Sequence, residues 1–468
     1  MSTVTETPKV QEKTAPESNT TKETTETMNT SKKIPVVRKE LLFPFIIITS
    51  LFALWGIAND LTNPMVSAFK KVMPELSNVQ ASLVQFAFYF GYFFMALPAA
   101  LFIRKQSYKS GIILGLSLYA IGAFLFYPAA AYEEFTYFLV SLWIITCGLA
   151  FLETTSNPLI LSLGDKETAT QRLNLAQAFN PIGSLMGMIV AQQFVISALR
   201  SDDYTEAAYK ALSSEELAAV RENDLGVISL PYIGLGIVVL VIMSIIIFTK
   251  MPKTAAEDKM GLKESFDKLF ANKNYVQGVI AQAFYVGAQI MCWTYIFQYV
   301  ENLNISLTAD AQLTATWFNV AAMIIFLTGR WIGTALMKTI NPSKLLFLFG
   351  IGGVVCTAGA ILIPGAFGLY SLVAVSLFMS IMFPTIYGIA LKNMGDEAKI
   401  GSAGLVMAIV GGALMPVIQG SILDWGGSGF ADVQILGYIP EVNFSFILPL
   451  ICLAVVANYG YRTYKRSI

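Results

Sequence analysis

The sequence predicts an all-α membrane protein with twelve transmembrane helices arranged as two six-helix halves. Apolar residues make up 55% of the chain and charged residues only 13%, with a mean hydropathy of +0.61, whereas soluble domains carry about 25% charged residues. Apolar runs of about 20 residues, the length that crosses a bilayer of about 30 Å, recur along the chain. A long, basic connection separates six of these runs from the other six.

Each apolar run is interpreted as one membrane-spanning helix. In the first half the runs cover residues 43–69, 80–103, 110–131, 136–163, 173–199 and 226–249. In the second half they cover residues 275–300, 311–337, 345–364, 367–391, 400–423 and 444–461. Prolines within five runs predict kinks, which a helix bundle tolerates; they are Pro64, Pro158, Pro181, Pro384 and Pro416.

The runs divide the chain into four parts. Residues 1–41, rich in Thr, Glu, Lys and Ser, are expected to form a disordered cytoplasmic tail because they cannot bury enough apolar surface. An N-terminal six-helix bundle (42–250), a cytoplasmic central loop (251–273) and a C-terminal six-helix bundle (274–468) follow. An external segment at about residues 200–226 has a helical pattern with Ser213 or Ser214 as its cap.

Lysine and arginine positions predict the orientation in the membrane. With both termini inside, 22 of the 31 basic residues fall in cytoplasmic segments near spans and five fall in external loops. Positive charge is retained on the cytoplasmic side of membrane proteins. We therefore expect a multi-pass membrane protein with cytoplasmic N- and C-termini.

Several classes of chemistry are excluded by what the sequence lacks. The chain has no histidine, so it contains neither a histidine proton relay nor a catalytic triad. Its four cysteines are isolated in apolar stretches without metal-ligand spacing, and no phosphate-binding Gly-Lys-[Ser/Thr] loop is present. We expect neither an enzyme nor a bound cofactor or metal.

Three ionisable residues lie deep in the predicted spans: Asp60, Glu153 and Arg330. A charge there costs several kcal/mol unless it faces a cavity or a partner, so each is a functional candidate. Because removal from water favours the uncharged form of a carboxyl group, Glu153 is suited to take up and release a proton as its surroundings change. The alternative is a locally paired structural acid. Arg330 has either a structural role, bracing an inner gate, or a side chain that extends along the helix to place its charge at the membrane boundary.

Asp60 lies in the segment Trp55–Pro64, "WGIANDLTNP". In a helix Asn63 falls one turn after Asp60 on nearly the same face, with Asn59 beside them. Grouped polar side chains on one face predict a wall of an interior cavity, and Asp60 becomes a second candidate for proton coupling. A position of Asp60 at the outer membrane boundary is the alternative.

Neutral amides and aromatic residues within the spans predict the class of substrate. Amides satisfy sugar hydroxyls and aromatic rings cover an apolar sugar face, which favours an uncharged polyhydroxyl compound. The amide candidates are Gln85, Asn157, Gln177, Asn180, Gln282, Gln289 and Asn319. The aromatic candidates are Tyr89, Tyr92, Tyr285, Trp293, Tyr295, Phe383 and Tyr387, although each taken singly is more often a packing residue.

Sequence blocks in order along the chain resemble the fucose:proton symporter family of the major facilitator superfamily. They are "SLFALWGIAND", "FAFYFGYFFMALPA", "YKSGIILGLSLYAIGA", "LETTSNP", "RLNLAQAFN", "FYVGAQIMCWTYI", "GRWIGT" and "FPTIYGIALKNMG". The resemblance implies the major facilitator superfamily fold. It also places Glu153 at the family's fourth-helix glutamate, which is linked to proton coupling and sugar binding. Asn63 stands where the family has its first-helix acid, and Asp60 lies one turn earlier.

The resemblance implies a proton-coupled symporter that imports a monosaccharide, with L-fucose as the expected cargo and H⁺ as the coupling ion. Asn59, Asn63, Gln85, Glu153, Asn157, Gln177, Asn180, Tyr285, Gln289, Trp293, Phe383 and Tyr387 are the expected sugar-binding residues. Alternatives are a glucose, galactose or N-acetylhexosamine transporter, with sodium as an alternative coupling ion, and a non-transporting sugar sensor. We expect the monomer to be the functional unit, without nucleic-acid partners.

Overall fold

The computed structural model describes residues 3, 34–62, 65–73, 75–76, 78–204, 208–209, 211–251, 261–305, 307–308, 311–395, 397–423 and 434–467. Residues Pro35–Ile468 form one compact unit. Among the described residues, twelve helical segments are long and apolar enough to cross a membrane. The predicted fold class is therefore confirmed.

Six of these segments make up the first half of the chain. Apolar sequence favours helices in a membrane because a helix satisfies its own backbone hydrogen bonds. The spans are built from α1 (Leu42–Thr62), α3 (Asn78–Lys105), α4 (Tyr108–Phe124) with α5 (Phe126–Ala131), α6 (Phe135–Ser162), α7 (Ala169–Gln177) with α8 (Asn180–Val190), and α10 (Ser214–Phe248).

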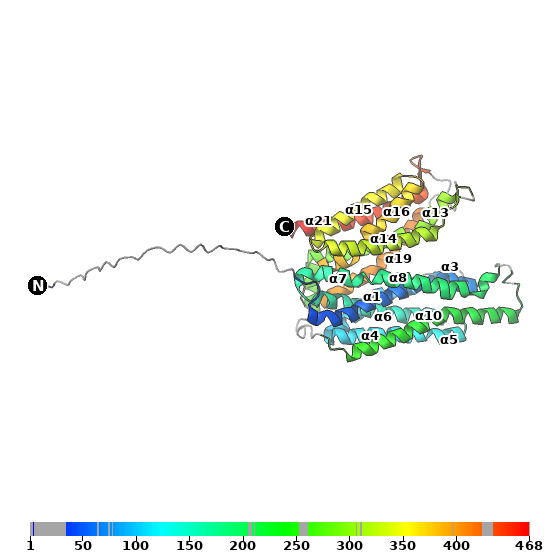
Figure 1. The fold of residues 1–468 in the computed structure, drawn as a ribbon, viewed down its shortest axis with the longest axis horizontal. Coiled ribbons are helices and arrows are strands. Elements are labelled where there is room, and N and C mark those ends of the chain that lie inside the picture. The colour runs from blue at the N-terminus through cyan, green and yellow to red at the C-terminus, as the bar shows by residue number, and fades with distance from the viewer. Residues whose placement is uncertain are drawn as a thin grey trace, which may run out of the picture. The chain divides into compact units, whose positions relative to one another are not determined.

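The second half repeats this arrangement with six further spans. They are built from α12 (Lys273–Thr294) with α13 (Ile296–Ile305), α14 (Ala315–Leu336), α15 (Pro342–Leu362), α16 (Ala366–Met379) with α17 (Met382–Ala390), α18 (Glu397–Met407) with α19 (Gly411–Leu423), and α20 (Glu441–Ser445) with α21 (Ile447–Lys465). In Figure 1 the blue-to-green helices of the first half and the yellow-to-red helices of the second half form two neighbouring bundles.

Short elements join or extend the spans. They are η1 (Lys39–Leu41), α2 (Met65–Val72), η2 (Lys166–Thr168), η3 (Ala191–Val195), η4 (Ile196–Ala198), η5 (Arg200–Asp203), α11 (Leu262–Ala271) and η7 (Ala408–Val410). Strands β1 (Gln434–Ile435) and β2 (Ile439–Pro440) pair antiparallel, with Gln434 opposite Pro440.

The helix boundaries differ from the predicted spans in two places. The predicted external helix and the sixth span form one continuous helix, α10, whose N-cap Ser213 makes a capping box with Glu216. The first predicted span, 43–69, is divided, because α1 ends at Thr62 and α2 begins at Met65. Pro64 stands between them in the sequence, and a proline cannot donate a helical backbone hydrogen bond.

Parts of the predicted tail and of the predicted central loop are structured. The backbone oxygen of Val36 accepts a hydrogen bond from Arg172 Nη1 at 3.1 Å, so the last residues of the predicted tail pack on the first half. Helix α11 occupies much of the predicted central loop. The rest of both predicted regions, residues 1–2, 4–33 and 252–260, lies outside the described residues.

Two of the five prolines follow breaks in a span. The α-helix is interrupted at residues 178–179, before Pro181, and at residues 380–381, before Pro384. By contrast, α6 and α19 continue through Pro158 and Pro416. The two breaks free backbone carbonyl groups at the ends of α7 and α16 for other donors.

Glycines allow helices beside the centre to approach closely. A Cβ atom added at Gly183 of α8 would lie 2.0 Å from the backbone oxygen of Ala53 in α1. In the second half, a Cβ at Gly411 would lie 2.2 Å from the backbone oxygen of Ala283 in α12. Small residues are the usual means of close helix packing in membranes, and here they fix α1 against α8 and α12 against α19.

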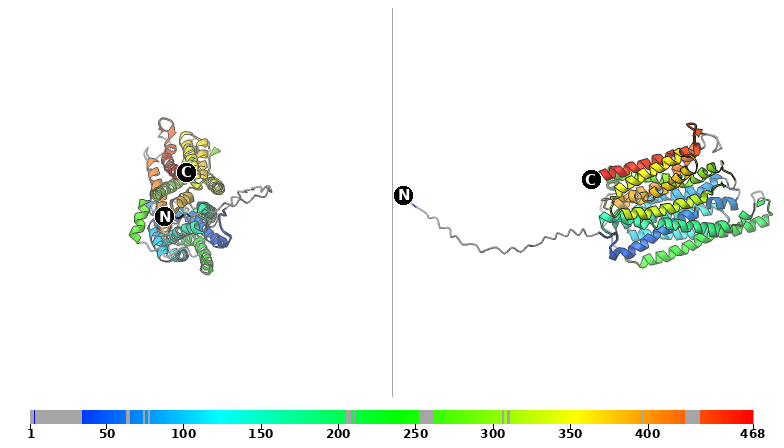
Figure 2. Two further views of the ribbon diagram at one scale, coloured as in Figure 1. Left: turned by 90° about the vertical axis from the view of Figure 1, so that its left-hand side faces the viewer. Right: turned by 45° about the horizontal axis from the view of Figure 1, so that its top comes forward.

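The first membrane-spanning helix begins, and the last one ends, on the same side of the bundle. Helix α1 begins and α21 ends at one end of the bundle (Figures 1 and 2). We call it the basic end, because Arg38, Lys105, Lys166, Lys338 and Arg462 lie next to the helix termini there. The opposite end is called the far end.

Candidate functional site

A cavity of about 160 Å³ lies between the two halves. One water needs roughly 15 Å³ on this measure, so the cavity has room for a small organic molecule. Its lining from the first half is Trp55, Asn59, Asp60, Phe88, Tyr89, Tyr92, Glu153, Gln177, Asn180, Pro181 and Ser184. Its lining from the second half is Tyr285, Val286, Gln289, Ile290, Trp293, Met323, Phe326, Arg330, Phe383 and Ile409.

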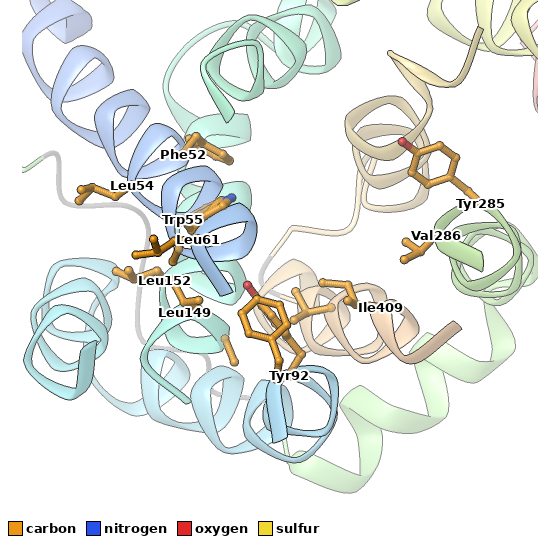
Figure 3. Packing of buried hydrophobic residues seen from close by; sticks show 14 of the residues in the cluster. Phe52, Leu54, Trp55, Leu61, Tyr92, Leu149, Leu152, Tyr285, Val286 and Ile409 are labelled. Carbon is orange, nitrogen blue, oxygen red and sulfur yellow. The ribbon is translucent and has the colours of Figure 1, made fainter. Parts of the chain in front are cut away.

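Apolar and aromatic side chains cover much of this wall. Figure 3 shows Trp55 on α1 and Tyr92 on α3 in the first half, with Tyr285 and Val286 on α12 across from them. The indole nitrogen of Trp293 donates to Ser376 Oγ at 3.2 Å, which fixes the orientation of that ring. Aromatic faces beside a few polar groups suit a molecule with both apolar and hydroxyl-bearing surfaces.

Both predicted carboxyl groups reach this cavity. Glu153 of α6 and Asp60 of α1 are part of its lining, and the side chain of Glu153 is almost buried, with 6% of its surface exposed. Among the described residues, no ion pair involves Glu153. The carboxyl group therefore faces the cavity without a fixed cationic partner from that part of the chain.

A chain of amides connects Glu153 to the cavity wall. Asn157, one turn after Glu153, donates from Nδ2 to the backbone oxygen of Glu153 at 3.0 Å. Its Oδ1 accepts from Gln177 Nε2 at 2.8 Å. Because Asn157 is fully buried and holds the amide nitrogen of Gln177, the side-chain oxygen of Gln177 remains to accept a hydrogen bond from a ligand.

Arg330 joins the two broken spans beside the cavity. Its Nη1 donates to the backbone oxygen of Gln177, the last residue of α7, at 2.9 Å. Its Nε donates to the backbone oxygen of Ser380 at the break between α16 and α17, and its guanidinium carbon lies 4.7 Å from the Phe326 ring centroid. The side chain is 3% exposed, so the positive charge is held by carbonyl groups freed at both breaks.

Further contacts join the halves between the cavity and the basic end. Gln171 Nε2 donates to the backbone oxygen of Thr334 at 3.0 Å, and Asn174 Nδ2 donates to Thr385 Oγ1 at 3.1 Å. The Nζ atom of Lys399 lies 5.7 Å from the centroid of the Tyr108 ring. Together with the Arg330 bond to Gln177, these contacts close the structure below the cavity on its basic side. We call this set the inter-half contacts.

The structure brings most predicted site residues to one place. Asn59, Asp60, Glu153, Gln177, Asn180, Tyr285, Gln289, Trp293, Arg330 and Phe383 line the cavity. Asn157 and Tyr387 are fully buried and do not line it. Asn63 lies outside the described residues, and so does the side chain of Gln85, although its backbone is part of α3.

Several lining residues were not predicted from the sequence. Trp55 lies one turn before Asn59, Ser184 one turn after Asn180, and Phe326 one turn before Arg330. The helical period that places residues four apart on one face is the signal that finds them. Met323 and Ile409 are apolar and could not be predicted from the sequence, because only the packing of the halves brings them to the cavity.

Comparison with known proteins assigns the family. The model of the Major Facilitator Superfamily matches residues 41–418. The chain belongs to this superfamily. This superfamily member is 54% identical over 435 residues to the L-fucose-proton symporter of Haemophilus influenzae, covering 92% of this chain and 98% of the relative. It is 32% identical to a glucose/galactose transporter of Brucella abortus, covering 90% and 94% of the two chains.

A solved structure of the superfamily has the same fold over nearly the whole chain. FucP, a major facilitator superfamily transporter in the outward conformation, superposes with a TM-score of 0.80 at 33% identity, covering 91% of this chain and 99% of that chain. The overall fold is thus shared with an experimentally determined transporter.

Proposed function

We propose that this protein is a proton-coupled symporter that imports L-fucose. The observation that supports this most strongly is the 54% identity to a curated L-fucose-proton symporter over almost the full length of both chains. The cavity adds independent support, because it combines aromatic walls, neutral amides and two carboxyl groups. Such a lining suits an uncharged sugar and a proton, and the relatives are transporters, not enzymes.

The side of the membrane that the cavity faces is inferred from the orientation of the protein. We assign the basic end to the cytoplasm, because positive charge is retained on that side, and with it the N- and C-termini. The bacterial relatives support a location in a bacterial inner membrane. The inter-half contacts lie between the cavity and this end. Because these contacts close the basic side, we assign the structure to the outward-facing state, the conformation named for FucP.

Each site residue has a role in this mechanism. External sugar enters the cavity, where Asn59, Gln177, Asn180 and Gln289 hydrogen-bond its hydroxyl groups and the aromatic residues cover its apolar face. Glu153 carries the proton, with Asp60 as a second acid of the cavity; Asn63, Gln85, Asn157 and Tyr387 are the remaining expected contributors. The halves then rock, and sugar and proton leave together. Coupling requires that the loaded and empty forms prefer different states.

Arg330 acts in this scheme as a gating residue. It holds the end of α7 in the first half to the break of the second half while the cavity faces outward. Opening toward the basic end must break the bond to Gln177, because that bond spans the two halves. The monomer contains the cavity and all these groups, so we propose that it is the functional unit.

The test replaces the proton-carrying carboxyl group by an amide. Proteoliposomes with the Glu153→Gln protein are expected to lose accumulation of L-fucose against its gradient, while exchange of internal for external sugar continues. Glu441→Gln is a matched control, because Glu441 is a buried glutamate, 2% exposed, outside the cavity. A Glu153→Gln protein that still concentrates L-fucose as the wild type does would refute the role of Glu153.

A second cargo is favoured by one observation. The chain is 32% identical to a glucose/galactose transporter over 90% of its length. Competition of labelled L-fucose uptake by glucose, galactose and N-acetylglucosamine, with and without sodium, separates these cargoes. We expect inhibition by unlabelled L-fucose at far lower concentrations than by the other sugars, and no sodium requirement.

A further inference from the structure

Gln282 on α12 is a fully buried amide whose polar atoms have no hydrogen-bond partner in the described part of the chain. Its side chain is 0% exposed, and neither Nε2 nor Oε1 has a hydrogen-bond partner among the residues that the structure describes. The hydroxyl group of Tyr285, one turn later and also 0% exposed, shares this property. Leaving a buried donor or acceptor unsatisfied is costly, so each such group requires an explanation. For a protein that alternates between two states, a partner present in the other state supplies one.

The direction of Gln282 follows from helix geometry. Successive residues of an α-helix are about 100° apart, so the cavity-lining side chains of α12 span an arc of about 140° between Tyr285 and Ile290. Gln282 lies about 60° into this arc, near its middle. It therefore projects from the same face of α12 as Tyr285, Gln289 and Trp293, which line the cavity.

The position of Gln282 along the helix differs from that of the lining residues. Three residues before Tyr285, it lies about 4.5 Å further toward the basic end, since an α-helix rises about 1.5 Å per residue. Gln282 is not part of the cavity lining. At this depth the inter-half contacts close the structure, for example where Asn174 binds Thr385.

From these observations we propose that Gln282 is a sugar-binding residue of the inward-facing state. The proposal rests on the proposed function, which supplies the sugar. When the halves separate at the basic end, the face of α12 that is now covered becomes part of the inner passage. The amide of Gln282 then donates to and accepts from hydroxyl groups of the departing sugar, while Gln289 and Trp293 belong to the outward-facing cavity. Two successive subsites thus lie on one face of α12.

The test measures L-fucose affinity separately from the two faces. Full-length wild type and Gln282→Leu are compared in right-side-out and inside-out membrane vesicles, with labelled L-fucose as the probe. Leucine has a similar volume and no hydrogen-bonding group. For Gln282→Leu we expect the half-saturating concentration at the basic face to rise roughly five- to thirtyfold, the loss of one or two net hydrogen bonds of about 1 kcal/mol each. At the outer face it should stay within about twofold of wild type.

Matched variants separate binding from packing. Gln277→Leu makes the same replacement on the same helix, at a residue whose Oε1 is also buried without a hydrogen-bond partner among the described residues. Residue 277 lies about 80° outside the cavity-facing arc, so both faces should keep wild-type affinities. The melting temperature of Gln282→Leu should equal or exceed that of wild type, because an unpartnered amide is removed. If Gln282→Leu does not fold, Gln282→Asn gives the same comparison with a shorter amide and a smaller loss at the basic face only.

The outcomes distinguish this proposal from the proposed function. Wild-type vesicles that show no L-fucose flux contradict the proposed function itself. Active wild type with Gln282→Leu unchanged at both faces overturns the inner subsite and leaves a purely structural amide. Equal loss of affinity at both faces also overturns it, because Gln282 would then serve the outward-facing cavity.

Discussion

Removing the guanidinium of Arg330 should open the basic end of the protein. In the structure Arg330 Nη1 donates to the backbone oxygen of Gln177 across the two halves. Methionine in the Arg330→Met variant keeps a long apolar stem but cannot donate. The bond to Ser380 lies within the second half, so its loss affects both states alike, and only the bond to Gln177 changes the balance between closed and open forms.

The size of the shift follows from the kind of bond. A hydrogen bond to a charged group contributes about 1.5–3 kcal/mol, and 1.4 kcal/mol is tenfold in an equilibrium constant. The population open at the basic end should therefore rise about ten- to hundredfold in Arg330→Met. Asn174→Leu removes a neutral inter-half bond to Thr385, contributing about 0.5–1.5 kcal/mol, so its effect should be about two- to tenfold.

A cysteine at position 170 reports the opening. Thr170 is buried and packs against Gly388 of the other half, where an added Cβ would lie 2.8 Å from its Oγ1. In a Thr170→Cys background, the rate of alkylation by a water-soluble maleimide should follow the order Arg330→Met, then Asn174→Leu, then the background protein. Asn274→Leu is the control, because Asn274 donates to Ile389 within one half.

The refuting result is specific. If Arg330→Met is alkylated at the same rate as the background protein, Arg330 does not hold the halves together. The same conclusion follows if Asn274→Leu accelerates alkylation as much as Arg330→Met, because loosening within one half would then explain the reactivity. External sugar should slow alkylation in the background protein if it binds the outward-facing state.

Three further predictions concern stability. Arg38 holds the pKa of Asp165 below its usual range by a hydrogen bond. The stabilising effect of the charged Asp165 is therefore present near neutral pH and is lost as the pH falls. The melting temperatures of wild type and Asp165→Asn should converge on acidification. Ser213→Ala removes the cap of α10 and should cost about 1 kcal/mol, seen as faster amide exchange at its start. Gly183→Ala meets a backbone oxygen at 2.0 Å and should lower the melting temperature, whereas Gly226→Ala, with open space around it, should not.

Which parts of the fold the sequence could predict depends on the solvent around each residue. The twelve spans were predictable because lipid demands long apolar helices. The boundary of α10 was missed, since its polar start at Ser213 resembles a separate surface helix while its backbone continues into the membrane. The close contact of Gly183 with α1 is likewise absent from any local pattern, because it depends on residues far apart in the chain.

The candidate site was predictable where charge was out of place in the membrane. Glu153, Asp60 and Arg330 stood out by that rule, and all three line the cavity. Asn157 was also predicted, from its polar side chain, but it does not line the cavity and accepts a hydrogen bond from Gln177 instead. The direction of its side chain depends on the helix that packs against it. Side-chain direction across packed helices is a tertiary property that spacing along one helix does not determine.

The central claim is that sugar and proton cross together, and the most direct measurement is proton flux driven by sugar. Purified protein in sodium-free proteoliposomes, with no initial pH gradient and a permeant ion to discharge the membrane potential, is given external L-fucose while a pH electrode follows the medium. The account predicts that the medium becomes more alkaline as labelled L-fucose enters, and that Glu153→Gln abolishes this change. Entry of L-fucose into wild-type vesicles without any change in external pH would contradict it.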